Sequence, residues 1–386
     1  MQKSMMTAED IVDYCYQCGK CSGKCPLGHI MESPRVIIQK VLSGDTEEVI
    51  KSKDVWRCLT CNECTVPECP MAINFAEFIR TIRTNAVREG YQNFRETHHE
   101  VFKTATRLMA NPNIKPNKLL NWPEDAKISK EGETALFVGC LEFFDNVSYF
   151  ADMGAKYGEI SKDAVRILNE LNIVPVVVED EKCCGHDVLW SGDEETFLKL
   201  AEYNTTAFKK ANVKRIITTC AECYRTLAVD YPNYVPDFDF EVIHLSEFLA
   251  KKIDEGKLKF PRHFNRVVTY HDPCRLGRHM SVYDAPRKVM ERIPGLTLKE
   301  MKKNKEKALC CGVSSWLNCD DYAKAIRIDR LTDAQNTGAQ ILVNTCPKCE
   351  MHFNCLRCEK GEDKPLDFTK LEVMDFVTLV AKALGI

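Results

Sequence analysis

Cysteine is the residue type in this chain with the greatest capacity for chemistry, since 21 of the 386 residues are cysteines. Eight of them form two similar runs near the N-terminus. The first run is Cys15, Cys18, Cys21 and Cys25 before Pro26, and the second is Cys58, Cys61, Cys64 and Cys69 before Pro70. The first reads C-x2-C-x2-C-x3-C-P, a spacing that binds a [4Fe-4S] cubane, and the second repeats it with one extra residue. The runs therefore predict two iron–sulfur clusters rather than two zinc sites, which C-x2-C pairs alone would also suit.

The spacing within each run predicts how the clusters share the eight cysteines. Three thiolates spaced by two residues wrap one tight turn around a cube, and the fourth lies too far along the chain to close the same cube. In two-cluster ferredoxins this fourth cysteine ligates the other cluster. We expect one cubane on Cys15, Cys18, Cys21 and Cys69, and the other on Cys58, Cys61, Cys64 and Cys25. This pairing places the cubanes side by side, close enough for electrons to pass.

Ten further cysteines repeat in two units. The first unit carries Cys140, Cys183, Cys184, Cys220 and Cys223, and the second carries Cys274, Cys310, Cys311, Cys346 and Cys349. Matching cysteines lie 134, 127 and 126 residues apart, so one insertion or deletion reconciles the units. Residues 240–253 also align with 371–384, and we expect each unit to end in the same amphipathic helix. The pattern indicates an internal duplication.

Five cysteines per unit are one more than an ordinary cubane accepts. Neighbouring residues in a strand project to opposite faces, so an adjacent pair can serve one cluster only where the backbone turns sharply. Gly185 and Gly312, which follow the adjacent pairs, allow such a turn. The set indicates either an enlarged cluster or one cysteine left free for chemistry.

The elements that must position these cysteines alternate between strands and helices. Short apolar runs at 135–139, 174–178, 215–219, 267–270 and 340–344 predict strands of parallel sheets. The cysteines fall where these strands end, the usual place for ligands in open α/β sheets. Cys220 and Cys346 lie between a strand and a helix, whose N-terminal N–H groups suit an anionic cluster.

The N-terminal region is expected to be helical around its clusters. Thr7 and Asp10 suit a capping box, Ser33-Pro34 starts a helix that Gly44 ends, and residues 71–90 form another helix. The apolar residues of that last helix should pack in a core rather than bind a ligand.

Composition excludes several classes of protein. Hydrophobic residues make up 45% of the chain, and 53 Lys+Arg against 56 Asp+Glu give a net charge of −3, which indicates a folded multi-domain protein without the basic stripe of a nucleic-acid binder. No apolar stretch approaches the roughly 18 residues of a membrane-spanning helix. The N-terminus has no export signal, so we expect a cytoplasmic chain whose cysteines bind metal rather than form disulfides.

The repeated pattern, Cys-Cys-Gly followed by C-x2-C, resembles the CCG domain of heterodisulfide reductases. Fused behind two ferredoxin clusters, it resembles the D subunit of the membrane-associated heterodisulfide reductases of methanogenic archaea, over essentially the whole chain. The resemblance implies an α+β multi-domain fold: a helical two-cluster ferredoxin domain over 1–110, a linker over 111–132, and duplicated α/β CCG domains with parallel sheets over 133–255 and 256–386. In that family each five-cysteine set holds a non-cubane [4Fe-4S] cluster, which implies two such clusters here.

The resemblance also implies a reaction. The family reduces the mixed disulfide of coenzyme M and coenzyme B to two thiols at the pair of non-cubane clusters, with electrons relayed through the cubanes. The chain has no flavin or nicotinamide fingerprint, so a membrane cytochrome b subunit or another donor protein must supply the electrons. Such a partner would hold the chain peripherally at the inner face of the membrane, and so many clusters indicate an anaerobe.

Several side chains are candidates for roles near the clusters. His186, beside the first CCG, and His271, just before Cys274, could donate protons to the leaving thiolates or could instead hydrogen-bond cluster sulfurs. Arg275, Arg278 and Lys348 could bind the sulfonate or phosphate groups of the coenzymes, unless they are merely solvated.

Three cysteines remain, Cys319, Cys355 and Cys358, and we expect buried spare thiols rather than a small zinc site.

Two other functions share this outline. One is an iron–sulfur electron-transfer subunit of a flavin-dependent glycolate, lactate or glycerol-3-phosphate dehydrogenase, and the other is a reductase of a different disulfide or persulfide. Two complete five-cysteine sets favour disulfide chemistry, because a relay has no evident use for two open clusters.

Overall fold

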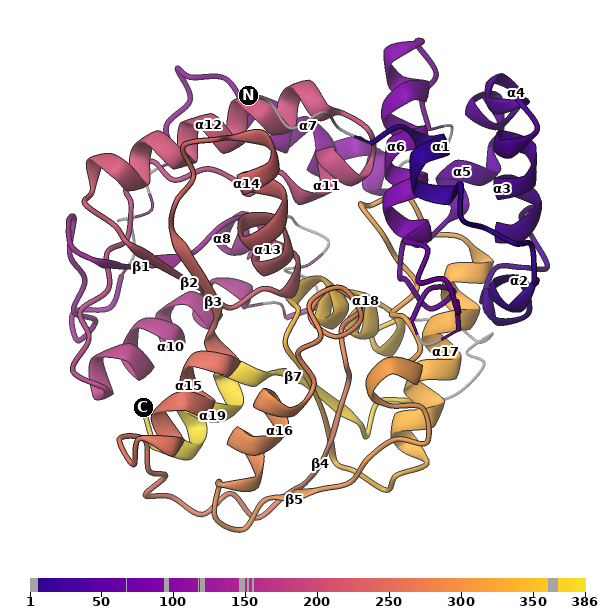
Figure 1. Cartoon of the computed structure of the whole chain (residues 1–386). Coiled ribbons are helices and arrows are strands. Elements are labelled where there is room, and N and C mark those ends of the chain that lie inside the picture. The colour runs from indigo at the N-terminus through magenta and orange to yellow at the C-terminus, as the bar shows by residue number, and fades with distance from the viewer. Residues whose placement is uncertain are drawn as a thin grey trace.

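The computed structural model describes residues 6–66, 68–93, 97–116, 118, 122–145, 150, 153–154, 156–359 and 367–386. Within them, a group of N-terminal helices lies against two α/β units, as Figure 1 shows. The fold is therefore the expected mixture of a helical domain and parallel sheets.

The N-terminal helices are short and surround the first eight cysteines. They are α1 (Ala8–Val12), α2 (Lys20–Lys24), α3 (Pro34–Leu42), α4 (Thr46–Lys51), α5 (Asp54–Arg57) and α6 (Phe75–Arg88), followed by η1 (Thr97–Glu100) and α7 (Val101–Met109). The capping box is confirmed, since the Thr7 side chain accepts a hydrogen bond from the Asp10 backbone and the Asp10 carboxylate accepts one from Thr7. Phe75, Phe78, Ile79 and Ile82 of α6 are buried, which confirms its core face.

Each α/β unit contains one parallel sheet. The first unit orders its strands β1 (Thr134–Phe137), β2 (Arg215–Thr218) and β3 (Glu241–His244). The second orders them β5 (Thr297–Leu298), β4 (Val267–Tyr270), β6 (Ile341–Asn344) and β7 (Glu372–Asp375). Every pairing is parallel.

Helices connect these strands. The first unit contains α8 (Leu141–Asp145), α10 (Tyr157–Glu170), α11 (His186–Trp190), α12 (Glu194–Lys210), α13 (Ala221–Arg225), the π-helical turn η2 (Thr226–Asp230), α14 (Tyr231–Tyr234) and α15 (Leu245–Asp254). The second contains α16 (Asp284–Glu291), η3 (Lys305–Lys307), α17 (Asp321–Gln335), α18 (Pro347–Arg357) and α19 (Phe376–Leu384). One hydrophobic core spans both units, because Leu249 of α15 and Val380 of α19 belong to the same buried cluster.

One predicted strand is absent, and the expected helix at the end of each unit, α15 or α19, is present. Residues 174–178 form no regular strand and contribute only isolated bridges from Val176 to Ser129 and Ala135. Pro175 lacks the N–H group that a continuous ladder would need there. The alignable segments 240–253 and 371–384 are not helices alone, because each begins with a strand, β3 or β7, before the helix.

The linker expected over 111–132 is partly tied to the first unit. Residues 117 and 119–121 lie outside the described residues. Lys118 is buried and its ammonium donates to the Gly139 carbonyl, while the Ser129 backbone donates to Pro175.

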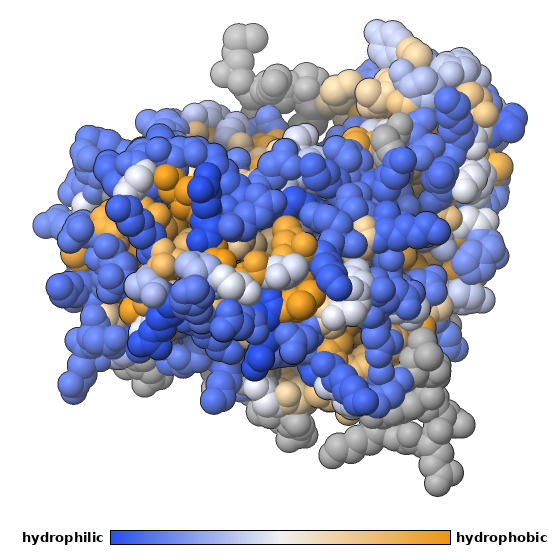
Figure 2. Space-filling model, turned by 90° about the horizontal axis from the view of Figure 1, so that it is seen from below, coloured by the Kyte–Doolittle hydropathy of each residue, from blue (hydrophilic) through white to orange (hydrophobic). Residues whose placement is uncertain are grey.

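The outer surface differs from these cores. Viewed from below in Figure 2, the molecule is mainly hydrophilic, and its hydrophobic groups are confined to patches. Among the described residues, no helix is long and apolar enough to cross a membrane.

Candidate iron–sulfur centres

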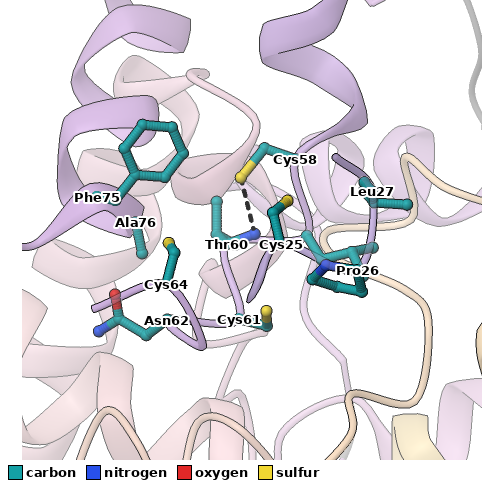
Figure 3. A pocket seen from close by; sticks show the side chains of 11 residues that line it. Cys25, Pro26, Leu27, Cys58, Thr60, Cys61, Asn62, Cys64, Phe75 and Ala76 are labelled. Atoms are coloured by element: carbon teal, nitrogen blue, oxygen red, sulfur yellow. Dashed lines mark hydrogen bonds between the residues drawn. The ribbon is translucent and has the colours of Figure 1, made fainter. Parts of the chain in front are cut away.

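Four cysteines from two separate loops line one pocket of the N-terminal domain, drawn in Figure 3: Cys25, Cys58, Cys61 and Cys64. Cys25 follows α2, whereas the other three follow α5. Thr60 and Asn62 have left-handed backbones with φ of 46° and 64°, which wraps this loop tightly, and the Thr60 N–H donates to the Cys58 sulfur at 3.3 Å. The structure thus brings together the four cysteines expected to share one cubane.

The other four N-terminal cysteines lie nearer the surface. Cys18 is exposed, and the Gln17 amide donates to the Cys15 sulfur at 3.5 Å. Burial raises the pKa of the Cys21 thiol, and the neighbouring Cys15 and Cys69 add to that rise. Cys69, from the second run, is therefore close to cysteines of the first.

All five cysteines of the first unit line a second pocket: Cys140, Cys183, Cys184, Cys220 and Cys223. The sulfurs of Cys184 and Cys223 are 3.4 Å apart. Gly185 has φ of +80°, and a Cβ there would lie 2.9 Å from the Phe197 ring, so the sharp turn after the cysteine pair requires glycine. Val138, Leu141 and Phe144 form an apolar part of the wall, and His186, Asp187, Glu222 and Lys348 form a polar part.

The second unit repeats this arrangement. The Cys310 thiol interacts with those of Cys274 and Cys311, and the Cys349 thiol interacts with those of Cys311 and Cys346. Gly312 has φ of +90°, and a Cβ there would lie 2.6 Å from the Ala323 carbonyl oxygen.

The two five-cysteine sets meet each other and the N-terminal pocket. The Cys220 thiol of the first set interacts with the Cys346 thiol of the second, and the Ala221 N–H donates to the Thr345 carbonyl at 3.3 Å. On the other side, the Cys61 thiol interacts with that of Cys310. A continuous series of thiols thus connects the N-terminal pocket, the second set and the first set.

The two candidate histidines are both buried, in different surroundings. The Nε2 atom of His186 accepts a hydrogen bond from Arg275 Nε at 3.2 Å, and its Nδ1 lies 2.8 Å from the Thr226 hydroxyl. The Nδ1 atom of His271 accepts from Arg330 Nε at 3.0 Å, and its Nε2 has no hydrogen-bond partner in the described part of the chain. Burial, reinforced by the nearby arginines, lowers both pKa values well below the usual range. Of these two rings, only that of His271 has a nitrogen without a hydrogen-bond partner among the described residues.

The candidate anion-binding side chains have partners within the protein and are not solvated. Arg275 donates to the Thr60 carbonyl at 3.0 Å and to its hydroxyl at 2.8 Å, and Arg278 Nε donates to the Cys61 carbonyl at 2.7 Å. Both arginines fasten the loop after Cys274 to the cysteine loop of the N-terminal domain.

Lys348 belongs to a charged group that the sequence interpretation missed. Its ammonium binds the carboxylates of Asp187 and Glu222, the latter at 2.7 Å, beside the first cysteine set. The available signal was the position of Glu222 and Lys348, each in the same place within a C-x2-C motif.

The three spare cysteines do not form a compact metal site. Cys319 and Cys358 are exposed and Cys355 is half-buried, so the expectation of buried thiols is wrong. Within the described residues, none of them belongs to a close group of three possible metal ligands.

Comparisons with known proteins agree with this geometry. Residues 134–228 and 268–354 match the family model of the cysteine-rich CCG domain, and residues 5–74 match that of the 4Fe-4S dicluster domain. The chain is 32% identical to the D subunit of the dihydromethanophenazine:CoB–CoM heterodisulfide reductase of Methanosarcina mazei, over 97% of this chain and 94% of that protein.

Other relatives are more distant. The chain is 27% identical to the EtfAB:quinone oxidoreductase of Syntrophomonas wolfei, over 94% of this chain and 58% of that protein. It is also 27% identical to the B subunit of the fumarate reductase (CoM/CoB) of Methanothermobacter marburgensis, over 94% of this chain and 71% of that protein. A crystal structure of a hypothetical protein from Helicobacter pylori shares the fold, with a TM-score of 0.52 and 11% identity over 92% of this chain and 68% of that one.

The dicluster domain, the duplicated cysteine-rich domain and their converging thiols define an iron–sulfur oxidoreductase subunit. The donor chemistry fits such clusters, because four thiols gather in one pocket and five in another. Within this class, the chain belongs to the family of heterodisulfide reductase D subunits.

Proposed function

We propose that this chain is the catalytic iron–sulfur subunit of a heterodisulfide reductase that reduces the mixed disulfide of coenzyme M and coenzyme B. The reaction is R–S–S–R′ + 2 e⁻ + 2 H⁺ → R–SH + R′–SH. The observation that carries the proposal is the meeting of two complete five-cysteine sets at Cys220 and Cys346. A two-electron cleavage needs two one-electron centres in close proximity, and two adjacent sets provide them.

The proposal assigns each cysteine to a cluster. Two cubanes would be held by Cys15, Cys18, Cys21 and Cys69, and by Cys58, Cys61, Cys64 and Cys25. Two non-cubane [4Fe-4S] clusters would be held by Cys140, Cys183, Cys184, Cys220 and Cys223, and by Cys274, Cys310, Cys311, Cys346 and Cys349. When bound, these clusters supply electrons one at a time.

The protein's own side chains prepare the site for a disulfide. Val138, Leu141 and Phe144 line the pocket of the first cysteine set, and the Lys348 ammonium, paired with Asp187 and Glu222, lies at its edge. The unpartnered N–H of His271 suits a hydrogen bond to sulfur beside Cys311. His186 already donates or accepts at both ring nitrogens, so its role under this proposal is to orient Arg275.

The electron donor is a second protein. We propose a membrane cytochrome b subunit or another donor protein that docks at the cysteines near the surface, around Cys18. The chain itself would remain in the cytoplasm, attached peripherally to the membrane through that partner.

A relay function is the second candidate, because the EtfAB:quinone oxidoreductase is a relative over 94% of this chain. A relay would pass electrons between a flavoprotein and a quinone without binding a disulfide.

Turnover assays separate these functions. Anaerobically purified protein should oxidise two equivalents of reduced methyl viologen for each equivalent of the coenzyme M–coenzyme B disulfide. Cys184→Ser should abolish this activity, whereas Cys358→Ser, at an exposed thiol outside the cysteine sets, should retain it. The relay function would be supported instead if wild-type protein with its full iron content reduced a soluble quinone but not the disulfide.

A further inference from the structure

The duplication allows the two cysteine-rich centres to be compared at matching positions. Around the first centre, His186, Asp187 and Glu222 correspond to Val313, Ser314 and Lys348 of the second unit. Around the second centre, His271, Arg278, Arg330 and His352 correspond to Phe137, Phe144, Tyr203 and Thr226 of the first unit. The two copies have therefore kept their cysteines, whereas the polar and charged side chains around them differ.

Two buried guanidinium groups lie near the second centre, and that of Arg330 also pairs with Asp333 at 3.3 Å. Arg278 and Arg330 are at most 5% exposed, and the electrostatic influence of Arg278 reaches Cys274 and Cys310, while that of Arg330 reaches Cys349. One terminal nitrogen of each guanidinium has no hydrogen-bond partner among the residues described. The same holds for the Nε2 atoms of His271 and His352, which both lie near Cys311.

Four nitrogens without a hydrogen-bond partner surround one set of thiols, which indicates that a hydrogen-bond acceptor binds among them. Buried polar groups almost always have a hydrogen-bond partner, so their concentration here points to an anion at the cysteines. The sulfurs of a negatively charged iron–sulfur cluster fit this requirement.

The first centre has two carboxylates close to its cysteines, those of Asp187 and Glu222. The Lys348 ammonium is balanced by Asp187 and Glu222, both of which it binds. Lys118 donates to the Gly139 carbonyl nearby, and Asp187 acts electrostatically on Cys183 and Cys220. Carboxylates next to a cluster disfavour an added electron, whereas buried guanidinium groups favour it.

The N-terminal domain contacts both units, and its thiols meet those of the second centre. The Cys61 thiol interacts with Cys310, Arg278 donates to the Cys61 carbonyl, and the hydroxyls of Thr60 and Ser314 share a hydrogen bond of 2.8 Å. Many buried apolar residues of the N-terminal domain form one core with Leu276 and Leu317 of the second unit, whereas Ala76 and Phe102 belong to cores that contain residues of the first unit.

We infer that the two cysteine-rich centres are unequal: the centre of Cys274, Cys310, Cys311, Cys346 and Cys349 has the higher reduction potential and accepts each electron from the N-terminal domain before the other centre does. Arg278 and Arg330 are the residues that tune it. This inference rests on the proposed occupancy of both sets by clusters, but not on the identity of the disulfide.

Redox titration of the whole protein, followed by EPR, tests the inference with reciprocal variants. Arg330→Gln should lower the midpoint potential of one cysteine-rich centre by about 59 mV or more. For a one-electron couple, about 59 mV is a tenfold change in the ratio of reduced to oxidised centre. Arg330→Lys keeps the charge and should leave that potential near the wild-type value. Asp187→Asn should raise the potential of the other centre.

The outcomes are distinct. The inference would be overturned if Arg330→Gln and Arg330→Lys shifted the midpoint potential equally. It would also be overturned if Arg330→Gln and Asp187→Asn shifted the potential of the same centre. If Arg330→Gln does not fold, Arg278→Gln should lower the potential of the same centre together with that of the cubane held by Cys61. Wild-type protein with about 8 rather than about 16 iron atoms per chain would refute the occupancy itself, whereas full iron without disulfide turnover would refute only the proposed substrate.

Discussion

Glu222 and Lys348 occupy the same position in the two copies of the C-x2-C motif, and they form an ion pair of 2.7 Å across the boundary between the copies. An exact repeat would place like charges or identical side chains there. The pair therefore depends on divergence of the duplicated units, and it joins them beside the point where Cys220 and Cys346 meet.

Removal of Lys348 should be costly. Lys348→Met leaves the partly buried carboxylates of Asp187 and Glu222 without their buried cation, and breaking a buried pair costs about 3–5 kcal/mol. Guanidinium unfolding curves should report this loss. Lys199→Met, at the exposed pair with Glu195, serves as the control and should change stability by less than about 1 kcal/mol. Similar effects of the two substitutions would contradict a structural role for Lys348.

The turn after each cysteine pair should tolerate no side chain. Gly312→Ala places a Cβ 2.6 Å from the Ala323 carbonyl oxygen at φ of +90°, so both a clash and left-handed strain result. Gly256→Ala has φ of +69° but open space, and should cost only the strain of about 1–2 kcal/mol. We expect Gly312→Ala to cost more and to lose the cluster of the second centre, as measured by unfolding and iron content. Equal losses of stability in the two variants would refute the steric argument.

The crossed pairing of the N-terminal cysteines makes a clear spectroscopic prediction. Cys25→Ser and Cys61→Ser should remove the same cubane signal in EPR spectra of reduced protein, because both cysteines line one pocket. Cys21→Ser should remove the other signal. If the four cysteines of each run instead bound one cubane, Cys25→Ser and Cys21→Ser would remove the same signal.

Stability should fall between neutral and mildly acidic pH. Burial lowers the pKa of His244 to about 4, below the unfolded value of about 6.5, so the unfolded chain binds the proton more readily. The neutral ring therefore stabilises the protein above pH 6.5, and this contribution disappears as the pH falls towards 4. Between pH 8 and 5, His244 should account for about 2 kcal/mol of lost stability. Unfolding midpoints of His244→Asn, which keeps a cap for α15, should show a weaker pH dependence, and an unchanged slope would exclude His244 as the cause.

Much of the architecture could be predicted from the sequence because the informative features are local. Short apolar runs located β1, β2, β4 and β6, and the spacing of the cysteines anticipated the sets that line the two pockets. The strand predicted at 174–178 is absent because Pro175 interrupts the hydrogen-bond ladder of the sheet. Strands β3 and β7 were missed because four residues directly before an amphipathic helix share its apolar pattern.

The surroundings of the centres could not be predicted, because they depend on which parts of the chain meet in space. Arg275 and Arg278 looked available for anions, yet Thr60 and Cys61, more than 200 residues away along the chain, accept their hydrogen bonds. The partners of Lys348 likewise come from the other copy of the repeat.

The central claim is that a coenzyme thiol binds at the paired cysteine-rich centres. The most direct test is EPR of the anaerobically oxidised protein, with and without coenzyme M and coenzyme B thiols. We predict a new paramagnetic signal with one thiol that disappears when its partner thiol is added. Spectra that ignore both thiols, in protein with its full iron content, would contradict the claim.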